Sequence, residues 1–201
     1  MRRTDQVWLG VDPGGKGSFG LAILRADGTV QTWCVDCADA AMGFVRQYLS
    51  TPPDGVGVDA PLWWSAGPSG DRRADQWLRK TYNLSGGQVQ TVNSLRGAAL
   101  AQGMMFVQQI RELFPKIPVT ETHPNALLKA LGLTWKSFAR RFRVSACGRT
   151  KHEHDAVISG VSAREGFSAR WKNDLSTRRH PSEQDPSLFW LAPIHYYWPE
   201  A

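Results

Sequence analysis

The first sixty residues of the chain contain two kinds of hydrophobic pattern, one typical of strands and one typical of helices. Short, nearly continuous apolar runs are typical of buried strands, and Asp27-Gly28, between the second and third runs, is a strong hairpin turn signal. These runs predict strands at residues 6–11, 19–24, 29–35 and 56–62. Between the third and fourth runs, apolar residues recur at helical spacing from Ala38 to Leu49 and predict a helix. The first three strands therefore form an antiparallel meander, and a helix connects them to the fourth.

The rest of the chain has mainly helical patterns around one further apolar run. The run predicts a strand from Ile117 to Glu121. The helical patterns span residues 72–82, 96–114, 124–131, 135–142 and 153–165. This order of strands and helices predicts an α/β fold with a mixed central sheet and helices on both faces.

Length and composition favour one domain with a small appendage. The chain has 201 residues, of which 42% are hydrophobic and 21% charged, as in ordinary soluble proteins. The pattern changes at Ser168, where a polar stretch begins and then gives way to the aromatic segment 187–199. We therefore assign residues 1–167 to the main domain and residues 168–201 to a C-terminal extension. The aromatic segment is expected either to pack back over the sheet or to dock a protein partner or a second subunit.

Charge and cysteine content indicate which binding partners and which cellular compartment to expect. The net charge of +6 favours an anionic partner such as nucleic acid. No apolar run reaches the roughly 20 residues that a membrane span needs, and the apolar stretch after the basic N-terminus is too short for a signal peptide. Three cysteines agree with a reducing compartment, so we expect a cytoplasmic protein without a membrane partner. We interpret Cys34 and Cys37 as a coincidence at a strand end rather than a zinc or redox motif.

Acidic residues follow three of the predicted strands. Asp12, Asp59 and Glu121 each end an apolar run, and Asp155 lies early in the last predicted helix. Neighbouring strand ends would bring these carboxylates together, and such a cluster is unfavourable unless a cation neutralises it. Carboxylate oxygens are suitable ligands for Mg²⁺ or Mn²⁺. The sequence therefore predicts a divalent-metal site formed by these four acids.

Four segments resemble a known family. They are VWLGVDPGGKGSFGLAIL, GVDAPL, ETHPNALLKALG and KHEHDAVISG, and they lie within residues 7–166. In their order and spacing they are similar to the domain of unknown function 429 family of predicted nucleases. That family is placed in the ribonuclease H-like fold, beside the Holliday-junction resolvases. Asp12, Asp59 and Asp155 match the acid positions of that fold, and Glu121 matches the family's own acid before a proline.

The resemblance implies a metal-dependent nuclease that hydrolyses phosphodiester bonds by a two-metal mechanism. Asp12 would then contact both ions, with Asp59 and Asp155 each on one side. His152 lies three residues before Asp155 and therefore on the same helix face, where it is a candidate metal ligand or general acid. Lys151 is a candidate phosphate contact.

Basic residues near these acids are candidate nucleic-acid contacts. Lys16 lies at the tip of the glycine-rich turn after Asp12, and a basic helix follows the Asp59 strand. The candidates are Lys16, Arg72, Arg73, Arg79 and Lys151. The acidic residue in that helix, Asp75, is expected to pair with Arg72 or Arg79.

Two other functional classes stay open at this point. The first is a catalytically inactive nucleic-acid-binding or scaffolding module, which would bind tightly without metal-dependent turnover. The segment from Asp12 to Gly20 also resembles the phosphate-binding hairpin of the actin-like kinase superfamily. Such phosphotransferases use two copies of the fold, whereas this sequence contains one copy of the hairpin. Nucleic-acid cleavage distinguishes the nuclease from the first class, and ATP hydrolysis distinguishes the second.

Overall fold

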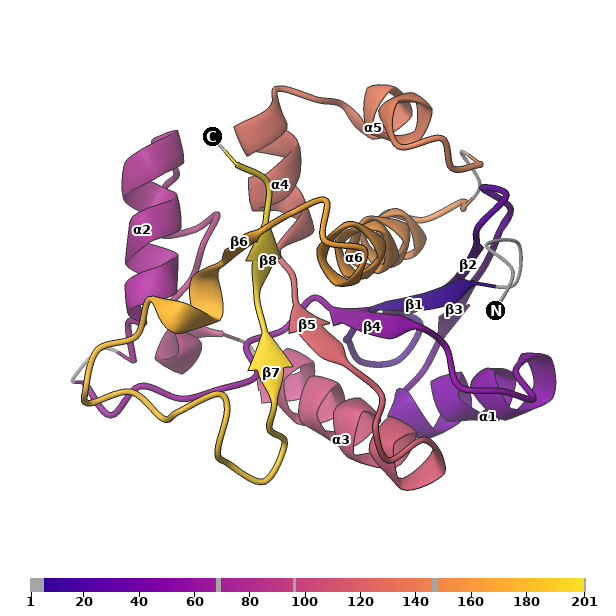
Figure 1. The fold of residues 1–201 in the computed structure, drawn as a ribbon, viewed down its shortest axis with the longest axis horizontal. Coiled ribbons are helices and arrows are strands. Elements are labelled where there is room, and N and C mark those ends of the chain that lie inside the picture. Colours follow the sequence, from indigo (N-terminus) through magenta and orange to yellow (C-terminus); the bar gives the residue numbers. More distant parts are fainter. Residues whose placement is uncertain (1–5, 68–69, 96, 146–147, 201) are drawn as a thin grey trace.

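A mixed six-stranded sheet forms the centre of the protein (Figure 1). The computed structural model describes residues 6–67, 70–95, 97–145 and 148–200. The strands are β1 (Val7–Asp12), β2 (Phe19–Arg25), β3 (Val30–Val35), β4 (Gly55–Val58), β5 (Val119–Glu121) and β7 (Ile194–His195), in the order β3-β2-β1-β4-β5-β7. The pairs β3–β2 and β2–β1 are antiparallel, while β4, β5 and β7 continue from β1 in parallel. The predicted meander and the mixed sheet are confirmed.

Helices cover both faces of this sheet, as predicted. One face is covered by α6 (Lys151–Phe167), and the opposite face by α1 (Ala38–Tyr48) and α3 (Gly97–Leu113), as Figure 1 shows. The remaining helices are α2 (Arg73–Tyr82), α4 (Pro124–Leu131) and α5 (Trp135–Arg141). Two 3₁₀ turns, Val92–Ser94 and Leu175–Thr177, and a small sheet of β6 (Asn173–Asp174) and β8 (Tyr197–Trp198) complete the described elements. Strand β4 ends at Val58, four residues earlier than predicted, and the segment after it carries Asp59.

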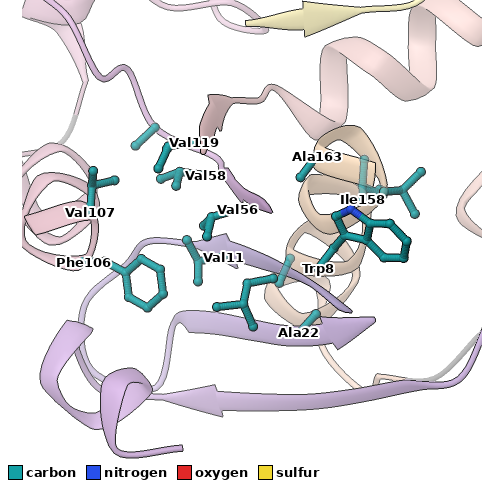
Figure 2. Close-up of a cluster of buried hydrophobic side chains, with 14 of the residues drawn as sticks. Trp8, Val11, Ala22, Val56, Val58, Phe106, Val107, Val119, Ile158 and Ala163 are labelled. Carbon is teal, nitrogen blue, oxygen red and sulfur yellow. The ribbon is translucent and has the colours of Figure 1, made fainter. Parts of the chain in front are cut away.

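Side chains alternate between the two faces of the strands, and the alternation determines which helix each one meets. On the α3 face, Val11 and Val58 pack beside Phe106, as Figure 2 shows. On the α6 face, glycines allow the helix to lie directly on the sheet. A Cβ atom at Gly10 would lie 1.9 Å from the carbonyl oxygen of Ala156, so this position has no room for a side chain. Because α6 is in direct backbone contact with the sheet, its first turns are held close to the strand ends.

The C-terminal extension returns to the central sheet. Strand β7 pairs with β5, and the next residue, Tyr196, is fully buried against Trp63, with ring centres 6.0 Å apart. The aromatic tail therefore packs back on the sheet, which was one of its two expected roles. Two apolar residues of the extension stay exposed, Leu188 (81%) and Trp190 (64%). Among the described helices, none is both long and apolar enough to cross a membrane.

Candidate metal centre

Three of the four predicted metal ligands meet at one edge of the sheet. Oxygen atoms of Asp12, Asp59 and Asp155 all lie within 4.8 Å of one another. Asp12 is the last residue of β1, and Asp59 follows the parallel neighbour β4, where its backbone N–H donates to the carbonyl of Val11 over 2.9 Å. The parallel register thus places both carboxylates at the same edge and, by alternation, on the α6 face. Asp155 reaches them from α6.

A capping box fixes the start of α6 and so the position of Asp155. The Thr150 side chain accepts a hydrogen bond from the Glu153 N–H, while the Glu153 carboxylate accepts from the Thr150 N–H. The same carboxylate accepts hydrogen bonds from the Arg149 N–H and from the Thr32 hydroxyl on β3. Burial raises the pKa of Glu153, but these hydrogen bonds outweigh it and leave the pKa lowered. Glu153 therefore fastens the first turn of the helix to the sheet as a carboxylate.

Burial and mutual repulsion act together on the three carboxylates. Burial, followed by the charges of Asp59 and Asp155, raises the pKa of Asp12 from 3.8 to about 9. The pKa of Asp155 is also raised, by burial first and by Asp59 second. A group of three acids in this state favours either protonation or a bound cation. The donor set, made only of carboxylate oxygens, fits Mg²⁺ or Mn²⁺.

Two basic side chains at the start of α6 contact the carboxylates. His152 Nδ1 lies 2.7 Å from Asp12 Oδ2, and Lys151 Nζ donates to Asp155 Oδ2 over 2.6 Å. Burial lowers the pKa of Lys151, but the hydrogen bond and charge of Asp155 outweigh it and raise the pKa. The Lys151 side chain is 65% exposed and that of His152 is 38% exposed, so each joins a carboxylate of the cluster to solvent.

His123 is a member of this site that the sequence analysis missed. It precedes α4, and its Nδ1 lies 3.6 Å from Asp59 Oδ1. Burial lowers the pKa of His123, but the hydrogen bond and charge of Asp59 outweigh it and raise the pKa. The signal in the sequence was its place two residues after Glu121 in Glu-Thr-His-Pro. In a continuous strand, residues 121 and 123 would point to the same face of the sheet. Because β5 ends at Glu121, this alternation does not continue to His123, and spacing alone did not assign His123 to Asp59.

The predictions for Glu121 and Arg72 were wrong, and strand register explains both errors. Glu121 pairs in register with Val58 rather than with Asp59, so its side chain points away from the α6 face. There its carboxylate accepts two hydrogen bonds from the Arg72 guanidinium, of 2.7 and 2.5 Å, and one from the Leu62 N–H. Arg72 is 1% exposed and also binds Asp75. Glu121 is therefore a partner of a buried arginine instead of a metal ligand, and the Arg72 guanidinium is held between two carboxylates instead of facing solvent.

Arg72 pairs with Asp75, as one of the two expected pairings proposed. Arg79 instead donates two hydrogen bonds to the Asp71 carboxylate and one to the carbonyl of Val89, so its guanidinium holds a loop. The Arg79 guanidinium is thus engaged within the fold, and its role as a nucleic-acid contact stays a prediction.

Two other basic candidates are exposed. Lys16 lies at the glycine-rich turn that separates β1 from β2, and Arg73 is the first residue of α2. The turn takes Gly17 to a φ of +66°, a conformation that favours glycine. The roles of Lys16, Arg73 and Lys151 as nucleic-acid contacts stay predictions.

A cavity of about 240 Å³ opens beside the carboxylates. Asp12 and Asp59 form part of its wall, and the amide side chains of Gln88, Gln90 and Asn125 line it as well. Asp12 and Asp59 are therefore accessible from a space that a polar ligand can enter.

Comparison with known families identifies the chain. A family model described as "Protein of unknown function (DUF429)" matches residues 10–165. The chain belongs to this family. Comparisons with curated proteins and with solved structures found no match. The family match contains Asp12, Asp59, Asp155 and the three basic residues that contact them, whereas the extension that carries β7 lies outside it.

Proposed function

We propose that this DUF429 protein is a divalent-metal-dependent nuclease that hydrolyses phosphodiester bonds of nucleic acid. The observation that carries the proposal is the convergence of Asp12, Asp59 and Asp155 within 4.8 Å at the edge of an open cavity. Each of these carboxylates comes from a different element, so their meeting depends on the tertiary fold rather than on local spacing. The net charge of +6 adds support, because it favours a polyanionic substrate.

Topology supports the further proposal that the fold is ribonuclease H-like. An antiparallel meander of β1, β2 and β3 is followed by a helix and then by parallel strands beside β1. The first acid ends β1, the second follows β4 and the third lies on the last helix, which are the places that the resemblance implies. The family match and the strand order are consistent with this fold.

The residues present fit a divalent cation. Three oxygen donors face one another, and the raised pKa values of Asp12 and Asp155 reflect burial and repulsion between carboxylates, which a cation offsets. When bound, Mg²⁺ or Mn²⁺ supplies Lewis acidity toward a phosphate and lowers the pKa of a water molecule. Asp12, Asp59 and Asp155 hold the cation in this proposal.

The basic side chains at the rim supply the remaining chemistry in the proposal. His152 contacts Asp12 and is partly exposed, so it is the candidate for proton transfer beside the carboxylates. Lys151 carries its charge to the mouth of the site and is suited to a phosphate oxygen. His123 contacts Asp59 from the other side and orients that carboxylate. These roles divide proton transfer, phosphate binding and ligand orientation among three residues.

A cleavage panel tests the proposal directly. Labelled single- and double-stranded DNA, RNA, an RNA–DNA hybrid and a four-way junction are incubated with Mg²⁺, Mn²⁺ or EDTA. We expect metal-dependent cleavage of at least one substrate, and a loss on the order of a thousandfold or more in Asp12→Asn. Asp39→Asn makes the same chemical change at an exposed position on α1, so we expect it to keep full activity.

The other outcomes separate the remaining functional classes. Binding of nucleic acid without cleavage would contradict the nuclease and support an inactive binding module. ATP hydrolysis without cleavage would support a phosphotransferase. Full cleavage by Asp12→Asn would remove Asp12 from the site.

A further inference from the structure

An exposed stripe runs along the outer side of α2. Its members are Arg73, Gln76, Trp77 and Lys80, which lie at positions i, i+3, i+4 and i+7 and therefore on one helix face. Arg73, Gln76 and Lys80 are exposed, and Trp77 is half-buried. The stripe therefore presents two cations and an amide to solvent, around one aromatic ring.

The C-terminal extension completes a hollow over this stripe. The segment around residues 177–179 lies opposite α2 (Figure 1). Side chains of the two segments enclose about 450 Å³. The Arg178 guanidinium lies 4.6 Å from the centre of the Trp77 ring, in a cation–π contact. Arg179 forms an ion pair of 2.7 Å with Asp185 and keeps its side chain 39% exposed. We call this space the α2 hollow; it is lined by Arg73, Gln76, Trp77, Lys80, Thr177, Arg178 and Arg179.

The charge of the α2 hollow is unbalanced. Four cationic side chains line it, and none of the described residues that line it carries a carboxylate. Asp185 balances Arg179 alone. Gathering like charges is unfavourable unless an anion is bound. The α2 hollow therefore has the electrostatics of an anion site.

A second arginine-lined hollow makes the contrast clear. Arg164 and Arg170 lie in it beside Arg141 and Arg143, but the Glu165 carboxylate lines the same space. Glu165 accepts hydrogen bonds from both Arg164 and Arg170, so those charges stabilise the fold around α6. The α2 hollow lacks such an internal partner for Arg73 and Lys80 among its lining residues.

The position of the α2 hollow relates it to the metal centre. Arg72 and Asp75 project from the opposite side of α2 and line the cavity that Asp12 and Asp59 share. A helix with its side chains is about 10–12 Å across, so the hollow lies about one helix diameter from the cavity. Adjacent nucleotides along one strand of a duplex rise by about 3.4 Å, so a strand that enters the cavity needs only a few nucleotides to reach the hollow as well.

We propose that the α2 hollow binds backbone phosphates of the nucleic-acid strand whose scissile bond lies at the carboxylates, a few nucleotides away. This inference rests on the proposed function, because it assigns the hollow to the same substrate. Phosphates are the groups recognised, since Arg178 already covers the Trp77 ring and the exposed groups are cations. The extension, which lies outside the family match, thereby supplies half of a substrate-binding surface.

Binding in EDTA tests the hollow without any need for catalysis. Anisotropy of a labelled 20-nucleotide single strand and of the matching duplex is measured against salt for the full chain. Lys80→Glu changes the α2 side of the hollow, and Arg178→Gln changes the extension side. We expect each variant to weaken binding about three- to tenfold and to reduce the slope of log K against log salt by about one. Arg46→Glu, at an exposed position on α1, is the matched control and is expected to bind within about twofold of the parent.

Strand length gives a second readout. Affinity is measured for single strands shortened one nucleotide at a time. The affinities of the parent and Lys80→Glu are expected to become equal once a strand is too short to reach from the carboxylates to the α2 hollow. Parent-like binding by both variants would overturn the proposal. The proposal would also be overturned if a glutamate peptide competed for binding as strongly as a nucleic-acid strand of equal charge. The same holds if the variants bound inorganic phosphate more weakly than the parent but bound the strand equally well. Binding that depends on Lys80 and Arg178 without cleavage in Mg²⁺ would support the hollow and contradict the nuclease alone.

Discussion

Asp12 combines burial with two like-charged neighbours, and its pKa is raised to about 9 for those reasons. At pH 7 the metal-free carboxyl group therefore holds a proton, which a bound cation must displace. We predict that Mn²⁺ binding releases close to one proton at pH 7 and that the apparent affinity rises about tenfold per pH unit below 9. Titration calorimetry in two buffers of different ionisation enthalpy measures the release. Binding enthalpies that do not depend on the buffer would contradict the prediction.

Glu121 carries the same charge as Asp12 but faces a different environment. It is 2% exposed and holds Arg72, which would lose half of its carboxylate partners in Glu121→Ala. Breaking a buried ion pair from one side costs about 3–5 kcal/mol, so we predict a loss of stability of that order. Mn²⁺ affinity measured on the folded variant is expected to stay within about twofold of the parent. Urea denaturation measures the stability of Glu121→Ala. A large loss of Mn²⁺ affinity with unchanged stability would show that Glu121 is a metal ligand after all.

Sequence patterns predicted the helices and strands well where an element is long enough to show a hydrophobic pattern. The meander, the parallel strands that carry the acids and the main helices follow from apolar runs, and Asp12, Asp59 and Asp155 follow from strand ends and the start of a helix. Glu121 shows the limit of this reasoning. A strand end fixes the edge of the sheet that a residue reaches, while the face depends on register with the neighbour. That register, Val58 beside Glu121, is a tertiary property.

The shortest strands could not be predicted from the hydrophobic pattern of the sequence. Strands β6, β7 and β8 have two residues each, so alternation is not visible in the sequence, and the aromatic composition indicated burial without indicating where. The α2 hollow likewise joins residues about a hundred positions apart. The positions of Arg178 and Arg179 beside Arg73 could not be deduced from composition.

Packing of α6 on the sheet depends on glycine at the contact. A Cβ atom at Gly57 would lie 1.9 Å from the Ser159 carbonyl oxygen, which belongs to helix backbone and cannot move aside. We predict that Gly57→Ala costs about 3 kcal/mol or more and displaces Asp155 from the other carboxylates, so Mn²⁺ affinity falls as well. Gly43→Ala on α1 is the matched control, since a Cβ there meets nothing within 4 Å and alanine favours the helix. Equal stability of the two variants in thermal melts would show that α6 can shift without cost.

At the scale of the whole molecule, the extension and the family domain share one sheet. Strand β7 is its outermost parallel strand, and the Arg111 guanidinium on α3 donates to the carbonyls of Ala192 and Pro193 beside it. Tyr196 follows β7 and fills a space between Trp63 and Trp198. The core thus runs continuously from the family domain into residues outside the family match, and cooperative unfolding of both parts is expected.

Two substitutions in the extension test that continuity. Tyr196 is fully buried, and removing a large aromatic side chain from a core costs about 3–5 kcal/mol, so Tyr196→Ala is predicted to destabilise the whole chain by that amount. Trp190 is 64% exposed, so Trp190→Ala is predicted to change stability by no more than about 0.5 kcal/mol. Urea unfolding followed by circular dichroism is expected to give one transition for the parent and both variants, shifted only in Tyr196→Ala. Two separate transitions, with the family domain unaffected by Tyr196→Ala, would mean that the extension folds as a unit of its own. The α2 hollow would then join two independently unfolding parts, whereas one shared transition means that the same core holds both of its sides.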